Sequence, residues 1–172
     1  MYQMLLDSGI LKLDLVVYPS PQAYDAAVER FGALPPELHL RIGGMKVYLD
    51  GSPQGRTAWM REPYAGEADY RGYGTMEDAA LEEAMELACL RRTQLLCHCN
   101  GDGAAEQFLR CLAQVEQKHP EMAQLRPVII HGQLLAPDQL PRVKELGAVV
   151  SFFVAHVYHW GDVHLRNFGP ER

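Results

Sequence analysis

The amino-acid sequence predicts an α/β domain built on a parallel sheet. Short apolar runs typical of strands alternate along the chain with amphipathic helical segments. In the strands that carry polar residues, these residues gather near the carboxyl end of one face. A barrel covered by helices produces this pattern, and so does an open, doubly wound sheet. The pattern therefore indicates the fold class and leaves both architectures open.

Turn and capping residues delimit the expected elements. Ser20 and Pro21 open a helix that Gly32 ends. We expect strands over residues 11–19, 39–51, 93–100, 126–132 and 148–156, the last of which closes the regular pattern. We expect helices over residues 20–32, 76–92, 102–119 and 136–147. This order predicts helical crossovers between parallel strands.

A long connection over residues 52–75 interrupts this order. It is rich in glycine, proline and aromatic residues, and loops of this length are usually functional lids or binding loops. A solvated insertion is the alternative. Trp59, Tyr64 and Tyr70 favour packing of the loop against the domain.

Composition excludes several classes of function. The chain has 172 residues, of which 48% are hydrophobic and 22% charged, which suits one globular domain. A net charge of −6 and an isoelectric point near 5.6 argue against a nucleic-acid or membrane partner. No apolar run is long enough to span a bilayer. The cysteines lie in apolar patterns, so we expect reduced, buried thiols in a cytoplasmic protein.

The segment Cys97-His98-Cys99 raises the question of a metal or redox site. Neighbouring residues of a strand point to opposite faces, so these three side chains cannot converge on one ion. His98 shares its face with the polar Asn100, which places His98 at the mouth of the sheet. The two cysteines belong to the core.

Two other strands carry polar residues at comparable positions. By strict alternation Lys46 shares a face with Asp50, which is expected to serve a turn or to pair with Lys46. His131 shares a face with Ile129. A lone buried histidine is more often a satisfied core residue than a ligand. Two histidines at one height on adjacent strands, with Lys46 level on a third, favour a metal site, and imidazole suits zinc and similar ions.

Four segments of the chain share one resemblance. They are KVYLDGSPQGRTAWMREPY, CHCNGDGAAEQFL, VIIHGQLL and SFFVAHVYHWGDVHLRNFGPER. In this order and spacing they resemble the family 3 amidohydrolases, metal-dependent hydrolases related to N-substituted formamide deformylase. The resemblance implies a partial (β/α)8 TIM barrel, roughly strands 3 to 7, that occupies residues 1–172 and lacks the first and last strands. A complete barrel needs about 250 residues.

The resemblance also implies the residues of a metal centre. His98 matches the metal-binding histidine of the family's fifth strand, and His131 matches that of the sixth. Lys46 matches a fourth-strand position that in related enzymes can be a carboxylated lysine bridging two metals. The family's first-strand His-x-His pair has no counterpart in this sequence, and the chain ends at Arg172, before the eighth-strand aspartate. The chain is therefore expected to contain no catalytic base.

The resemblance assigns substrate-binding roles more loosely. His156 matches a histidine in a substrate-facing loop, whereas His159 is expected to be structural or exposed. Arg56 and Trp59 lie in the long loop, where lining of the substrate pocket, packing and a surface role are the alternatives. Asp102 could replace the missing base, but its place at a helix start favours an N-cap.

The function implied by the resemblance is hydrolysis of C–N bonds other than peptide bonds in small amide-like substrates. The expected cofactor is a divalent metal, with zinc as first choice, and the expected partner is another chain or segment that completes the barrel. The alternative is a non-catalytic remnant that binds or assembles through open strand edges. An open α/β domain of unrelated function would need a phosphate loop, and NGDGAAE lacks its spacing. Alone, the chain is expected to be inactive.

Overall fold

The computed structural model describes residues 2–172, and all strand pairs in it are parallel. β1 (Leu15–Val17) pairs with β2 (Leu40–Ile42) in a small sheet. The larger sheet has the order β3, β4, β5, β6, with bounds Met45–Tyr48, Leu95–Cys99, Val128–His131 and Val149–Phe152. The predicted parallel α/β class is confirmed.

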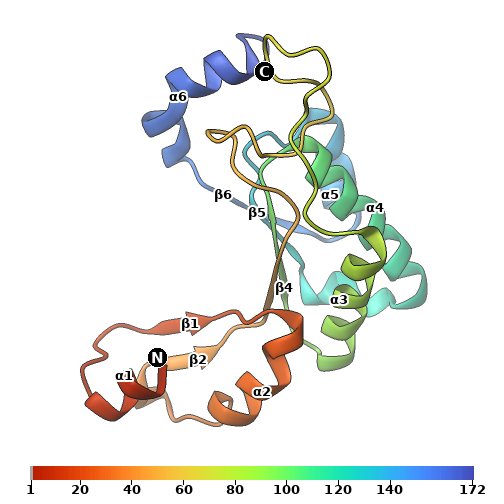
Figure 1. Cartoon of the computed structure of the whole chain (residues 1–172). Coiled ribbons are helices and arrows are strands. Elements are labelled where there is room, and N and C mark those ends of the chain that lie inside the picture. The colour runs from red at the N-terminus through yellow and green to blue at the C-terminus, as the bar shows by residue number, and fades with distance from the viewer. Residues whose placement is uncertain (1) are drawn as a thin grey trace.

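Helices cover one face of the larger sheet (Figure 1). They are α3 (Asp78–Arg91), α4 (Asp102–Lys118) and α5 (Leu140–Glu145). Helices α1 (Tyr2–Ser8) and α2 (Pro21–Phe31) accompany the small sheet, and α6 (Ala155–Phe168) follows β6. Short 3-10 helices η1 (Pro36–Leu38), η2 (Pro120–Leu125) and η3 (Pro137–Gln139) occupy three of the connections. Within residues 2–172, no helix has the length and apolar character needed to cross a membrane.

The single strand predicted over residues 39–51 is wrong, because the chain breaks at Gly44. A Cβ atom on Gly44 would lie 2.2 Å from the carbonyl oxygen of Gln94, so the approach requires glycine. The segment before the break pairs with β1 and the segment after it pairs with β4. The two sheets stay connected where the Lys46 N–H donates to the Pro19 carbonyl, at 2.9 Å.

The hydrophobic core lies between the larger sheet and helices α3 and α4. Met45, Leu95, Cys97 and Ile129 are completely buried in it. Ile129 pairs in register with Cys97, so the polar face predicted for Ile129 is wrong: this side chain belongs to the core. The four cysteines are free and buried, as predicted.

The chain ends in a helix that the sequence pattern does not predict. The strand expected over residues 148–156 ends at Phe152, and α6 begins at Ala155. Helix α6 has no side-chain N-cap, and apolar residues such as Val157 and Tyr158 are 73% and 88% exposed on it. The sequence therefore carries no capping residue that would mark the start of this helix, and its apolar residues do not form a stripe that packs on the core.

The long loop packs against α6. The ring centroids of Tyr64 and Phe168 lie 5.5 Å apart, and the Ala65 N–H donates to the Asn167 carbonyl at 2.8 Å. Tyr64 and Phe168 form a second, small hydrophobic cluster with the buried Ala58 and Met60. The first half of the loop, up to Tyr64, therefore packs as predicted, whereas most of residues 65–75, Tyr70 included, are exposed to solvent.

Replacing Gly44 with alanine should destabilise the fold, because the new methyl group would collide with the Gln94 backbone. We expect a loss of about 1–3 kcal/mol in the free energy of unfolding, measured by urea denaturation. Gly161→Ala is the matched control, since no atom lies within 4 Å of the Cβ position of Gly161 and alanine favours helix α6. An unchanged urea midpoint for Gly44→Ala would contradict this account.

Candidate functional site

Three histidine rings meet at the carboxyl end of the larger sheet. The ring centroid of His98 lies 4.7 Å from that of His131, which lies 5.7 Å from that of His156. His98 is on β4 and His131 ends β5, and these strands are adjacent and parallel. His156 stands in the first turn of α6. The structure thus brings together the three histidines that the sequence singles out.

The position of His131 depends on an unusual backbone conformation. Its φ angle is +75°, a region that residues other than glycine rarely occupy. His131 pairs in register with Cys99, which is buried in the core, so strict alternation would turn His131 toward the helices. Its ring instead contacts His98 and His156. Backbone strain of this kind concentrates at functional sites.

Polar groups surround one nitrogen of the His98 ring. Nε2 lies 3.1 Å from the Gly51 carbonyl oxygen, 3.6 Å from a carboxylate oxygen of Asp50 and 2.9 Å from Nδ2 of Asn100. A proton on Nε2 donates to Gly51, and Nδ1 then keeps the lone pair that a metal ion needs. With the proton on Nδ1, Nε2 accepts a hydrogen bond from Asn100 instead. The tautomer therefore decides which nitrogen can bind a ligand.

Asp50 anchors this end of the sheet. Its carboxylate is completely buried and accepts hydrogen bonds from three backbone N–H groups. The donors are Trp59 at 3.1 Å, Asn100 at 2.9 Å and Gly101 at 2.7 Å. Burial raises the pKa of the Asp50 carboxyl, and the three N–H donors oppose that rise. Asp50 thus ties the long loop and the β4–α4 turn to the end of β3.

Lys46 is not level with His98 on the sheet. It pairs in register with Leu96, and the residue that pairs with His98 is Tyr48. The Lys46 Nζ lies 5.0 Å from the centroid of the Tyr48 ring rather than on Asp50. Lys46 lines a cavity of about 330 Å³, and His131 lines a different one of about 220 Å³. The expectations that Lys46 stands level with the histidines and pairs with Asp50 are wrong.

The surroundings of His131 disfavour its protonated form. Burial lowers its pKa most, followed by the charges of His98, His156 and Lys46. The pKa of His131 falls to about 4. Burial and the neighbouring His164 also lower the pKa of His156. Neutral imidazole is the form that binds metal ions, so the surroundings of His131 favour that form at neutral pH.

His156 and its neighbours form one side of the site. Its Nδ1 forms a hydrogen bond with Oε1 of Gln133, a residue that no sequence motif marks as functional. The ring of Phe153 lies 4.6 Å from that of His156. Phe153, Leu135 and Gln133 also line the cavity beside His131. This side of the site is therefore mainly apolar, with the Gln133 amide as a polar group.

Arg56 and Trp59 make contacts within and beneath the long loop. The Arg56 guanidinium lies 5.2 Å from the centroid of the Tyr64 ring and forms an ion pair with Glu67 at 2.9 Å. The Trp59 carbonyl accepts the Gly103 N–H at 2.9 Å, which fixes the loop on the start of α4. These contacts support packing, and a role of either residue in binding substrate stays a prediction.

Asp102 is not the N-cap of α4, because that position belongs to Gly101. The Asp102 carboxylate accepts two hydrogen bonds from Arg61, one from the backbone N–H at 2.8 Å and one from Nε at 3.1 Å. The same guanidinium forms two hydrogen bonds with Asp138, at 2.7 and 2.8 Å. Arg61 therefore joins the long loop to α4 and η3. Asp102 is engaged in this ion pair, which accounts for its burial without a catalytic role.

Sequence comparisons match the whole chain to one family. A family model described as "Amidohydrolase family" matches residues 1–172. The "Putative amidohydrolase YtcJ" of Bacillus subtilis (strain 168) is 27% identical over 125 residues, which cover 71% of this chain and 23% of that protein. The "Protein LONG AFTER FAR-RED 3" of Arabidopsis thaliana is 28% identical over 133 residues, which cover 77% of this chain and 23% of that protein.

Two solved structures share the fold. Crystal structures of metal-dependent hydrolases from Pyrococcus furiosus and Pyrococcus horikoshii OT3 match with TM-scores of 0.79 and 0.78 and identities of 29% and 27%. Each match covers 99% of this chain, but only 34% and 33% of the respective solved chain. The likeness confirms the predicted fold class, a parallel α/β arrangement that corresponds to part of a barrel-like enzyme. The chain spans less than a quarter of its curated relatives and about a third of these structures.

Asp50→Asn should destabilise the domain, because an amide group carries one acceptor oxygen and its NH₂ faces backbone donors. We expect a loss of about 3 kcal/mol in the free energy of unfolding by urea denaturation. Asp69→Asn changes an exposed residue of the same loop and serves as the control. Equal unfolding midpoints for the two variants would show that the buried carboxylate is dispensable.

His131 should titrate far below the usual range of histidine. In the metal-free chain its ring should stay neutral as the pH falls from the ordinary value of 6.5, and gain a proton only near its pKa of about 4. An NMR titration of the imidazole signals measures this. His98→Ala removes one neighbouring charge, so the pKa of His131 should rise in that variant. A midpoint near 6.5 in the unaltered chain would refute the prediction.

Proposed function

This chain belongs to the amidohydrolase family, and we propose that it supplies part of the metal centre of a hydrolase that cleaves C–N bonds other than peptide bonds. The observation that carries the proposal is the contact of the His98 and His131 rings at the carboxyl ends of adjacent parallel strands. Two solved structures with this fold are named metal-dependent hydrolases, and one curated relative is named an amidohydrolase. These names support the reaction class.

The imidazole groups of His98 and His131 are donors of a kind that divalent cations accept. In the proposal His98 and His131 are the imidazole ligands of a divalent cation. The Gly51 carbonyl and Asp50 stand ready to accept the Nε2 proton of His98, and outer partners of this kind orient the histidines of metal sites. Lys46 is the proposed third position, which requires that carboxylation remove its positive charge. Imidazole ligands favour zinc among the common divalent ions.

The remaining residues bind and orient the substrate in this proposal. When bound, a divalent cation supplies Lewis-acid activation of water and of a substrate carbonyl. His156 contacts the substrate, with Gln133 holding its ring in place. The neighbouring cavity of about 220 Å³ is lined by apolar Leu135, Phe153 and Val157. Such a wall favours a small amide with an apolar group on nitrogen, such as an N-substituted formamide.

The same proposal requires barrel strands that complete the sheet, from a further segment or a partner chain, to supply the other ligands and the base. In the described part of the chain β6 pairs with β5 alone, so its other edge offers unpaired backbone groups. Phe152, Phe153, Val157 and Tyr158 are more than half exposed beside this edge. An apolar surface of this kind favours coverage by another element. The buried, free cysteines support a cytosolic location.

The exposed edge of β6 also favours a second candidate function, a non-catalytic module that assembles with another chain. Assembly through an apolar edge needs no metal ion at His98 and His131. Metal binding at these two rings therefore separates the two candidates.

Zinc titration of the chain, followed by the NMR signals of the imidazole rings, tests the metal centre. We expect the signals of His98 and His131 to shift together. His98→Ala should abolish the response of His131, and His131→Ala that of His98, because each ring alone is a weak site. His159→Gln, an exposed change on α6, should leave both responses intact. No response of either ring to excess zinc would overturn the metal centre.

Hydrolysis of N-substituted formamides tests the reaction. The chain alone should not turn over these amides, whereas addition of the completing barrel strands should produce activity. In that assembly His98→Ala or His131→Ala should reduce the rate roughly 100-fold or more. This loss is larger than the one expected from removing a residue that only orients a metal ligand. A rate that neither substitution changes would refute the assignment of the two ligands.

A further inference from the structure

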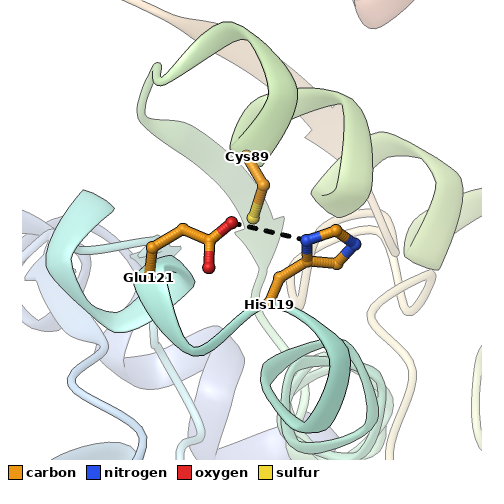
Figure 2. Close-up of side chains that lie close together, drawn as sticks. All are labelled: Cys89, His119 and Glu121. Carbon is orange, nitrogen blue, oxygen red and sulfur yellow. Dashed lines mark ion pairs between the residues drawn. The ribbon is translucent and has the colours of Figure 1, made fainter.

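A second group of metal-ligating side chains lies at the opposite end of the sheet from the histidine rings. Cys89 stands in the last turn of α3, His119 is the C-cap residue of α4, and Glu121 belongs to η2. Helices α3 and α4 lead into the starts of β4 and β5, so the group lies at the amino-terminal end of the strands. One ligand atom of each residue lies within 4.8 Å of those of the other two. Figure 2 shows the three side chains converging from two neighbouring parts of the chain.

The backbone holds these donors in place without a bound ion. The His119 N–H donates to the Val115 carbonyl at 2.8 Å, and the His119 carbonyl accepts the Met122 N–H at 3.0 Å. Pro120 separates His119 from Glu121 and restricts the backbone between them. The His119 Nδ1 and a Glu121 carboxylate oxygen lie 3.4 Å apart. Two of the donors are therefore preorganised by a single short turn.

The sulfur is fixed by packing of helix α3 against that turn. The Cys89 Sγ lies 3.3 Å from the Met122 Sδ, and Cys89 is 5% exposed. The His119 and Glu121 side chains are 36% and 52% exposed, so the group opens to solvent on one side. A sulfur, a nitrogen and an oxygen donor with one open position match the tetrahedral preference of zinc.

The local charge favours a cation. Burial, followed by the carboxylates of Glu121 and Glu86, raises the pKa of the Cys89 thiol. Lys118 pairs with Glu86 at 3.1 Å and offsets part of this negative charge. The carboxylates of Glu121 and Glu86 attract a dication, and metal binding would release the thiol proton to solvent.

We propose that Cys89, His119 and Glu121 bind one zinc ion, with water in the fourth position, at a structural site separate from the histidine centre. The ion would fasten the end of α3 to the α4–η2 turn. This role agrees with the location, since the amino-terminal end of the strands in such folds serves stability rather than catalysis.

Cobalt(II) binding to the 172-residue chain tests the proposal, because a thiolate ligand gives a charge-transfer absorption that histidine and carboxylate ligands do not. We expect this absorption in the unaltered chain and its loss in Cys89→Ala. His119→Gln and Glu121→Gln change partly exposed side chains, so they keep the test valid should Cys89→Ala fail to fold. Both should weaken cobalt binding and lose or shift the absorption.

Two controls separate this site from the proposed function. Cys111→Ala removes another buried thiol and should leave the absorption unchanged. His98→Ala removes the proposed hydrolase ligand and should also leave it unchanged. Zinc should raise the melting temperature of His98→Ala, in which the histidine centre is disrupted, but not of the double variant that combines His98→Ala with His119→Gln. Absence of the absorption, or its persistence in all three ligand variants, would overturn the proposal whatever the outcome for the histidine centre.

Discussion

A buried carboxylate holds together the carboxyl end of this sheet. Asp50 lies just beyond Leu49 at the end of β3, yet the three N–H groups that it binds belong to the long loop and to the turn between β4 and α4. Without an acceptor, each of these buried donors would cost about 1–3 kcal/mol. The β4–α4 turn sets Asn100 beside the His98 ring, and the carbonyl of Gly51, the residue after Asp50, lies within hydrogen-bonding distance of the His98 Nε2. The geometry of the candidate site therefore depends on the hydrogen bonds that the backbone N–H groups of the loop and the turn donate to Asp50.

The histidine rings illustrate how burial and strain prepare a site for chemistry. His131 reaches the mouth of the sheet only because its backbone adopts a positive φ angle, against the alternation of β5. Its pKa is lowered by burial and by neighbouring charges, which favours the neutral form that accepts a metal ion. Gln133 orients His156 in turn. Strands β4 and β5 and helix α6 thus contribute one histidine ring each, and neighbouring residues form hydrogen bonds with the rings of His98 and His156.

The two ends of the sheet serve different purposes in this interpretation. At the carboxyl end, polar side chains and a loop packed on α6 surround the histidines, and Arg61 ties that loop to α4 and η3 through two carboxylates. At the amino-terminal end, Cys89, His119 and Glu121 converge where two helices turn back into strands. This division follows from the parallel topology, which collects all strand ends of one kind at one edge. Changes at one end can leave the other intact.

The sequence by itself determined the parallel α/β class, the helix from Pro21 to Phe31, the core position of the cysteines and the place of His98 and His131 at strand ends. These features depend on local periodicity and capping. Tertiary structure alone decided the break at Gly44, the exposed helix α6 and the partners of Asp50 and Asp102. Asp50 and Asp102 bind groups 50 and 41 residues away, and no local pattern encodes such pairs. Only the packed chain brings those groups within hydrogen-bonding distance.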